Sequence, residues 1–216
     1  MTNQAQIAVS TSVTPSIPLS PAAYRIVGAI VGSLLVALCA HVSVPLLFTP
    51  VPLTLQTFAV LLLGLTLGPA TASAALALYL VQGAAGLPVF SPHGPGGVLQ
   101  LIGPTGGFLL SYPFAAALTS LLARRIRPAS FTSYAFSAAI GSALILAVGA
   151  SWFAILAHQS LSGTLKMTVW PFLPGDALKI CASATVAIGV FKLRNKFRGP
   201  SANPHRGDGT LWPLPK

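Results

Sequence analysis

Residues 26–47 read IVGAIVGSLLVALCAHVSVPLL, and no charged residue interrupts them. They open a run of 98 residues between Arg25 and Arg124 that contains no Asp, Glu, Lys or Arg. Charged residues make up 6% of the 216-residue chain, against roughly 25% in soluble domains, and the mean hydropathy is +0.79. Such a chain cannot cover a water-facing surface, which excludes a soluble globular protein and predicts helices that span a membrane.

The basic residues exceed the acidic ones by ten, and their positions indicate topology rather than nucleic-acid binding. Basic clusters stand at the ends of apolar stretches, at 124–127 and 192–198, without the interleaved aromatic residues of a nucleic-acid site. Lys and Arg beside membrane spans stay on the cytoplasmic side. The surplus of positive charge therefore predicts which loops face the cytoplasm.

Six membrane helices are predicted from the apolar stretches and the side on which each basic residue falls. Four stretches have the length of a span, at 26–47, 105–123, 134–157 and 174–191. The Gly68–Pro69 break divides 54–86 into two short helices, 54–68 and 71–86, and this division puts every basic cluster on one side. Eight basic residues between Arg25 and Arg198 then lie inside and Lys166 alone outside, so both termini are cytoplasmic.

The two ends of the chain are predicted to be disordered tails around one membrane domain, residues 24–195. Residues 1–23 are rich in Ser, Thr and Pro and lack the basic start of a signal peptide. Residues 196–216 form a polar tail that is rich in Pro and Gly. Cys39 and Cys181 lie in apolar stretches and indicate no disulfide framework.

Two outer loops rich in Pro and Gly, residues 45–52 and 87–103, lie beside the short middle helices. Irregular backbone at membrane depth is tolerated where it is buried in protein or lines a cavity. The loops therefore form a lid over a cavity or are ordinary connections, and the sequence leaves both open. His93 lies in the second loop and could touch a solute, whereas the four histidines are too far apart for a metal site.

Asp176 is the one acidic residue inside a predicted span, and Lys179 follows it on the same helical face. An ionisable group at membrane depth costs about 2.5 to 3.5 kcal/mol and usually faces the bundle interior beside a partner. The pair either neutralises itself or forms a polar site for a solute head group that has both N–H and C=O groups. A metal would need more acids or histidines.

Polar residues at two other helix starts lie at the same outer face. Thr54, Gln56 and Thr57 open the second span. We expect Thr54 to cap this helix, whereas Gln56 either binds a solute or bonds to a neighbouring helix. Thr105 lies in GPTGG (103–107), where backbone N–H groups could meet a carboxylate or the glycines could allow close packing.

Small and aromatic residues on the spans indicate what surrounds them. Ala29, Ser33 and Ala37 recur every four residues on the first span, which lets another helix approach closely. This stripe serves internal packing or the docking of a partner subunit. Trp152 and Trp170 lie near predicted outer boundaries, where we expect interfacial anchors.

Five motifs follow one another along the chain: TPVPLTLQT (49–57), LGP (67–69), GLPVF (86–90), GPTGGF (103–108) and PFLPGDxxK (171–179). Together they resemble the BioY family, the biotin-binding S components of energy-coupling factor (ECF) transporters of prokaryotes. The resemblance extends over residues 24–195. The chain departs from the family pattern at 91–95 and at Phe108, where Tyr is common.

The resemblance implies an all-α membrane protein with six helices and a biotin site near the extracellular side, capped by the loops after the first and third helices. It implies that Asp176 and Lys179 hold the biotin head. It also implies a partner module of two ATPases and one transmembrane coupling protein. That module fits a sequence without the Gly-Lys-Ser/Thr ending of a phosphate loop.

We therefore predict a multi-pass protein of the prokaryotic cell membrane that captures biotin outside and hands it inward with an ATP-driven partner. It is not an enzyme, and biotin is its substrate rather than a cofactor. The ureido ring meets the charged pair, or the valerate carboxylate meets the lysine. The alternatives are an S component for another small vitamin and a structural membrane protein. The candidate binding residues are Thr54, Gln56, Phe90, His93, Thr105, Phe108, Asp176 and Lys179.

Overall fold

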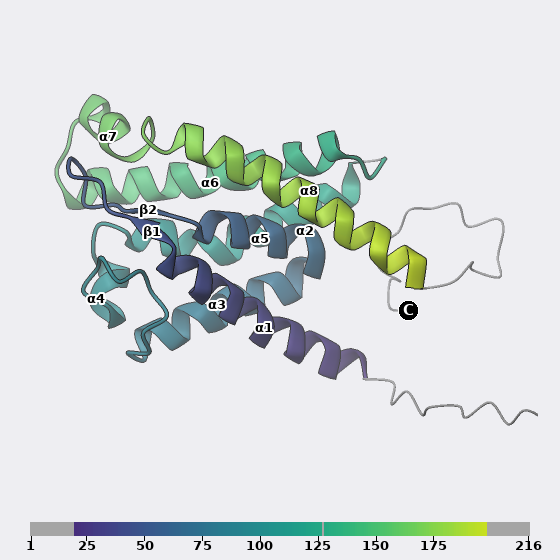
Figure 1. Ribbon diagram of the computed structural model, residues 1–216. Coiled ribbons are helices and arrows are strands. Elements are labelled where there is room, and N and C mark those ends of the chain that lie inside the picture. Colours follow the sequence, from purple (N-terminus) through teal and green to yellow (C-terminus); the bar gives the residue numbers. More distant parts are fainter. Residues whose placement is uncertain (1–19, 127, 198–216) are drawn as a thin grey trace, which may run out of the picture.

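Six helices run lengthwise in a bundle in the computed structural model, which describes residues 20–126 and 128–197 (Figure 1). They are α1 (Pro21–His41), α2 (Gln56–Leu67), α3 (Pro69–Ala84), α5 (Gly106–Arg125), α6 (Phe131–Leu156) and α8 (Leu173–Phe197). Four shorter elements gather at one end: strands β1 (Ser43–Val44) and β2 (Leu53–Thr54), and helices α4 (Gly97–Ile102) and α7 (Leu161–Thr168). Most of both predicted tails lies outside the described residues, although 21–23 belong to α1 and 196–197 to α8.

The first helix begins and ends earlier than predicted, because α1 spans Pro21–His41 rather than residues 26–47. Pro45 lacks a backbone N–H, and its ring would clash with the carbonyl of His41 four residues earlier if the helix continued. The chain turns instead into the antiparallel pair β1–β2, in which Ser43 lies opposite Thr54. The first outer loop, residues 45–52, thus connects the two strands of a small hairpin.

The break between α2 and α3 is confirmed. Gly68 has φ +88°, in the left-handed region that glycine adopts readily, and Pro69 follows as a first helical residue. Among the described residues, α1, α5 and α6 are long and apolar enough to cross a membrane, and α2 is a shorter apolar helix. The chain is therefore a mostly helical membrane protein with several apolar helices.

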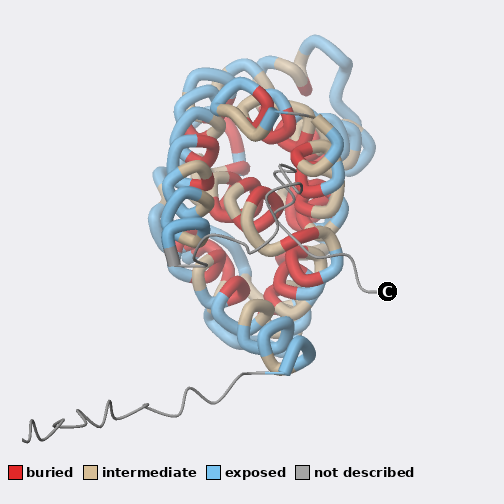
Figure 2. The backbone as a smooth tube through the Cα atoms, turned by 90° about the vertical axis from the view of Figure 1, so that its right-hand side faces the viewer, coloured by how far each residue is buried: buried red, intermediate tan, exposed pale blue. Residues whose placement is uncertain are grey.

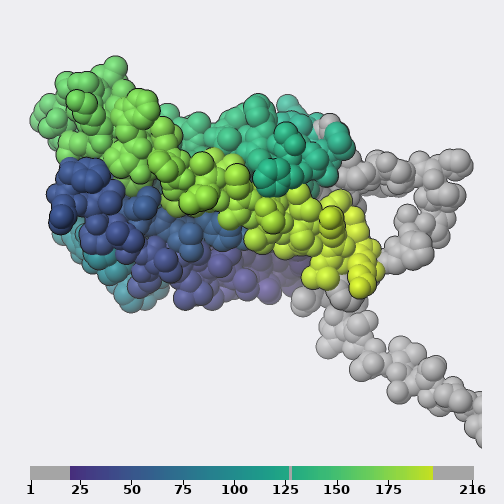
Figure 3. Space-filling model, turned by 45° about the horizontal axis from the view of Figure 1, so that its top comes forward, coloured from purple at the N-terminus to yellow at the C-terminus, as the bar shows by residue number. Residues whose placement is uncertain are grey.

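The core lies where α5 packs against α2, α3 and α6, with α1 on α3 and α8 between α2 and α6. Viewed along the bundle, the buried residues face inward and the exposed ones outward (Figure 2). Many exposed residues are large and apolar, such as Ile30 and Leu38 on α1, as expected for helices in lipid. Figure 3 shows α8 running along the outside of the bundle from the end that carries α7.

The small-residue stripe of α1 is largely covered within the chain. Ser33 is wholly buried and Ala37 is 8% exposed, while Ala29 is half-buried. At neighbouring Gly32 a Cβ atom would lie 2.9 Å from the Cβ of Ala75 on α3, so the two helices approach closely. Of the two interpretations of the stripe, the burial supports internal packing.

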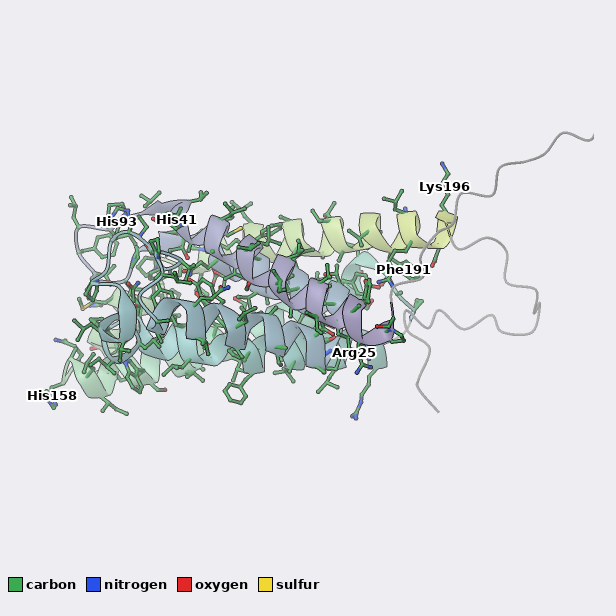
Figure 4. The ribbon with its side chains drawn as sticks, turned by 90° about the horizontal axis from the view of Figure 1, so that it is seen from below. Arg25, His41, His93, His158, Phe191 and Lys196 are labelled. Carbon is green, nitrogen blue, oxygen red and sulfur yellow. The ribbon has the colours of Figure 1, made fainter. Side chains whose placement is uncertain are left out.

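The histidines of the described residues lie at one end of the bundle. Arg25 and Lys196 lie at one end, whereas His41, His93 and His158 lie at the other (Figure 4). The latter end also carries the short elements, and we refer to it as the outer end, after the two loops that the sequence predicts to lie outside. Neither cysteine of the described residues forms a disulfide: Cys39 is buried in α1 and Cys181 is exposed on α8.

Candidate binding site

Asp176 and Lys179 form a buried ion pair in the first turns of α8. The Lys179 Nζ atom lies 3.1 Å from Asp176 Oδ1, and the two residues are 9% and 5% exposed, respectively. Local sequence explains the position: Pro174 suits the first turn because it lacks an N–H, and an acid there interacts favourably with the helix dipole. One helical face therefore presents a carboxylate and an ammonium to the bundle interior.

Two hydroxyl groups from other helices complete the coordination of this pair. Ser142 Oγ on α6 donates to Asp176 Oδ2 at 3.2 Å, and Lys179 Nζ donates to Thr57 Oγ1 on α2 at 3.2 Å. The pair is thus fixed on both sides between α2 and α6. Hydrogen bonds to buried charges are stronger than neutral ones, so these contacts hold both charged groups in place.

A small cavity of about 50 Å³ adjoins the pair. Its walls come from the first outer loop, the second outer loop and the helices around the core. They are Val51, Pro52, Thr54, Gln56, Thr57, Ser91, Gln100, Thr105, Phe108, Leu109, Tyr112, Ile145, Leu146, Phe172, Asp176 and Lys179. The structure therefore brings together six of the eight predicted binding residues, and the cavity combines the charged pair with both polar and apolar side chains.

Gln56 both lines the cavity and joins two helices. Its Nε2 donates to the hydroxyl of Tyr79 on α3, and its Oε1 accepts from the hydroxyl of Thr54 at 3.0 Å. Thr54 is not the cap residue of α2, because the cap falls on Leu55, which has no side-chain bond. The Thr54 hydroxyl instead accepts from the backbone N–H of Gln56 at 3.4 Å, so the predicted capping role is displaced by one residue.

The remaining two predicted residues lie elsewhere. Phe90 is buried, but its ring packs edge-on against Tyr79, with centroids 5.3 Å apart, and does not line this cavity. It thus supports Gln56 through Tyr79. His93 is exposed at the outer end and lines no part of the cavity. Both residues belong to the loop in which the chain departs from the family pattern.

The glycine-rich start of α5 packs closely against α6. Trp152 Nε1 donates to the carbonyl of Gly103 at 2.9 Å, and a Cβ atom at Gly107 would overlap the Trp152 side chain. This contact supports the close-packing interpretation of the motif. Trp152 is half-buried and tied to α5, which differs from a simple interfacial anchor, whereas Trp170 is 63% exposed.

Sequence reasoning missed several residues of the cavity. Ser142 lies 34 positions from Asp176 in an apolar helix, and nothing in its neighbourhood distinguishes it from the other serines of α6. Tyr112 and Gln100 line the cavity from α5 and α4. Gln100 is 2% exposed, and the sequence signal for it was an amide among the apolar residues of 98–102. Among the described residues, no three His, Cys, Asp or Glu side chains gather as a metal site would require.

Comparisons with known proteins agree on one family. The model of the BioY family matches residues 6–196. The "Probable biotin transporter BioY" of Bacillus subtilis is 38% identical over 144 residues, 66% of this chain and 76% of that protein. The "Biotin transporter BioY" of Thermotoga maritima is 35% identical over 159 residues, 74% of this chain and 90% of that protein.

One solved structure shares the fold. It is a crystal structure of the S component for biotin from an ECF-type ABC transporter, with a TM-score of 0.74 and 21% sequence identity. The similarity covers 82% of this chain and 95% of the solved one. At this identity the likeness establishes the fold of an S component, and the chemistry of the site rests on the residues described above.

Proposed function

The chain belongs to the BioY family, and on that premise we propose that it captures biotin at the outer face of the cell membrane for delivery to the cytoplasm. Curated relatives are named biotin transporters, which supports a multi-pass transport protein rather than an enzyme. The observation that carries the proposal is the buried Asp176–Lys179 pair in the wall of a cavity that the outer loops also line.

The ureido ring of biotin matches the charged pair in its hydrogen-bonding groups. Its two N–H groups are donors and its C=O is an acceptor, which match the carboxylate of Asp176 and the ammonium of Lys179. Ser142 and Thr57 already hold these groups, so little side-chain freedom is lost on binding. A neutral polar ring thereby meets a site with no net charge.

The sides of the cavity suit the apolar part of the same ligand. Phe108, Leu109, Ile145 and Phe172 present apolar surface beside the polar end. The thiophane ring and the start of the valeryl chain gain by leaving water, at about 25 cal/mol per Å² of apolar surface buried. Gln56 and Thr105 add polar contacts at the rim.

The opposite orientation places the valerate carboxylate against Lys179. It is disfavoured because Asp176 Oδ1 already occupies that ammonium and would repel a second carboxylate. Blocking the carboxylate of biotin as an amide distinguishes the orientations. Retained affinity for the amide supports the ureido orientation, and lost affinity supports the carboxylate one.

The proposed topology has six spans with both termini in the cytoplasm. In addition to α1, α5 and α6, it assigns spans to α2, α3 and α8, of which α2 and α3 have 12 and 16 residues. Such short helices can cross only when they are buried among longer ones or thin the bilayer. The packing of α2 and α3 against α1 and α5 is in keeping with this assignment.

The proposed transport step uses a partner module of two ATPases and one transmembrane coupling protein. The chain supplies no phosphate-binding loop of its own. If Ala29, Ser33 and Ala37 contribute to docking, they do so through the half-buried end of the stripe at Ala29, because the other two are already covered by the bundle.

Biotin binding by the purified protein tests the proposal. Asp176→Asn keeps the shape of the side chain, but removes the charge that accepts the ureido N–H groups. We expect affinity to fall about a hundredfold or more, since bonds to charged groups contribute about 1.5 to 3 kcal/mol each. Asp208→Asn, the same change at the other acid, should bind as the unaltered protein does. Equal binding by both variants would show that the assigned site is wrong.

The competing proposal is a structural membrane protein in which the pair only joins helices. It predicts that the unaltered protein binds no biotin and that Asp176→Asn lowers thermal stability alone. If the chain is an S component for another vitamin, the purified protein binds that vitamin and does not bind biotin. The family match and the donor and acceptor pattern of the pair favour biotin over both.

A further inference from the structure

A second and larger hollow lies at the outer end of the bundle, next to the cavity described above. Its volume is about 520 Å³, against about 50 Å³ for the inner cavity. It is formed by the end of α1 and by the segment from the end of α3 into α4. Its lining residues are His41, Gly86, Leu87, Pro88, Phe90, Ser91, Pro92, Gly94, Pro95, Gly96, Gly97, Val98 and Leu99.

The two hollows meet at Ser91, which lines both of them. Ser91 is 5% exposed, and its hydroxyl has no hydrogen-bond partner within residues 20–126 and 128–197. A buried polar group without a partner is costly, and such groups commonly await a ligand or water. The junction therefore offers a donor and an acceptor to a group that passes from one hollow to the other.

The walls of the outer hollow are held in place on two sides. Phe90 packs edge-on against Tyr79, and its ring covers Gly83 so closely that a Cβ atom there would overlap it. On the other side, His41 Nδ1 donates to the carbonyl of Ala37 at 2.8 Å, which fixes the ring at the rim. The hollow is thus part of the fold rather than a gap between loose loops.

The lining of the outer hollow combines aliphatic side chains with glycines and with the polar side chains of His41 and Ser91. Leu87, Pro88, Val98 and Leu99 provide aliphatic surface, and no acidic residue lines it. An aliphatic chain that ends in a polar or charged group suits such a surface, because the chain leaves water while its end remains solvated. The inner cavity, with room for only about four water molecules, offers no such space.

We propose that the outer hollow binds substituents attached to the carboxyl group of biotin through an amide, so that the site accepts ε-N-biotinyl-lysine as well as biotin. The inference rests on the proposed function, with the ureido ring at Asp176 and Lys179. The carboxyl end of the ligand then points outward, toward the junction. There the amide bonds to the Ser91 hydroxyl, and the lysine chain lies along Leu99 and Val98.

Displacement of tritiated biotin from the purified full-length protein tests the proposal. ε-N-Biotinyl-lysine should displace it with an affinity within about tenfold of biotin itself. Leu99→Trp enlarges a side chain that lines the outer hollow but not the inner cavity, and we expect it to weaken biotinyl-lysine by roughly tenfold or more relative to biotin. Leu47→Trp, at a fully exposed outer-loop position, is the matched control and should alter neither affinity.

The outcomes separate this inference from the proposed function. If the unaltered protein binds no tritiated biotin, the proposed function itself fails. If it binds biotin but biotinyl-lysine does not displace it, the function stands and the outer hollow is not a ligand subsite. If biotinyl-lysine binds but Leu99→Trp weakens both ligands equally or neither, the substituent lies elsewhere and the inference is overturned. Retained biotin binding by Leu99→Trp also shows that this variant folds.

Discussion

Gly149→Ala places a single methyl group behind one wall of the binding cavity. Gly149 lies in the second half of α6, and a Cβ atom there would come well under 3.0 Å from three ring atoms of Phe108. Phe108 is 8% exposed and lines the cavity. An ordinary carbon–carbon separation is about 3.5 to 4.0 Å, so the ring has to move by about 1 Å or more. The space beside it is the cavity.

The matched control is Gly189→Ala in the middle of α8, where a Cβ atom would meet nothing within 4 Å. Replacing Gly by Ala within a helix stabilises the helix by about 1 kcal/mol, and this gain is the same in both variants. Overpacking costs about 1 to 3 kcal/mol, and it applies to Gly149→Ala alone. The difference between the two variants therefore isolates the steric cost, and we expect Gly149→Ala to be about 1 to 3 kcal/mol less stable than Gly189→Ala.

Two measurements check this prediction. Reversible unfolding of the purified variants gives the difference in stability, and titration with biotin gives the affinity. We expect Gly149→Ala to bind biotin at least about tenfold more weakly, equivalent to about 1.4 kcal/mol, while Gly189→Ala binds normally. In a Phe108→Leu background the cost of Gly149→Ala should shrink, because the smaller side chain leaves room for the methyl group. If both alanine variants are equally stable and bind equally well, the assigned contact between α6 and the cavity wall is wrong.

Two further predictions concern the support of the site and the topology. Ser142→Ala removes the hydrogen bond to Asp176 and should weaken biotin binding by roughly tenfold. The control is Ser137→Ala: the Ser137 hydroxyl donates to the carbonyl of Ser133 in its own helix at 2.8 Å, and its loss should leave the biotin affinity unchanged. Equal effects of the two variants would show that Ser142 has no positioning role. In a cysteine-free background, Lys166→Cys should react with a membrane-impermeant maleimide on intact cells and Arg194→Cys only after permeabilisation, and the reverse pattern would invert the orientation.

The helical framework could be predicted from the sequence because lipid imposes strong constraints on composition. The uncharged run from residue 26 to 123 and the break at Gly68 predicted the main helices, and the break is confirmed by the left-handed backbone there. The end of α1 was missed because apolar residues continue beyond it, while Pro45 determines where the helix stops. Two-residue strands and the short helix α4 leave no periodic pattern for sequence reasoning to detect.

The site was predictable where its residues are neighbours on one helix. Asp176 and Lys179 are three positions apart, so their pairing follows from helical geometry alone. The hydroxyl groups that hold them lie 34 and 122 positions away, and their roles depend on how α8 packs between α6 and α2. The role of Phe90 was not predictable, because it depends on a tertiary contact. Its motif indicated the correct loop, but the ring packs against Tyr79, behind the binding residues.

The size of the inner cavity sets a condition on biotin binding. At about 50 Å³ it has room for about four water molecules, far less than a bicyclic ligand needs. The walls therefore have to separate, and those on α5, α6 and α8 are held by the bundle core and by the bonds to Asp176 and Lys179. Val51 and Pro52 lie on the first outer loop instead. When this loop moves, the charged pair stays anchored, so the binding free energy has to offset loop displacement but not the reorganisation of the pair.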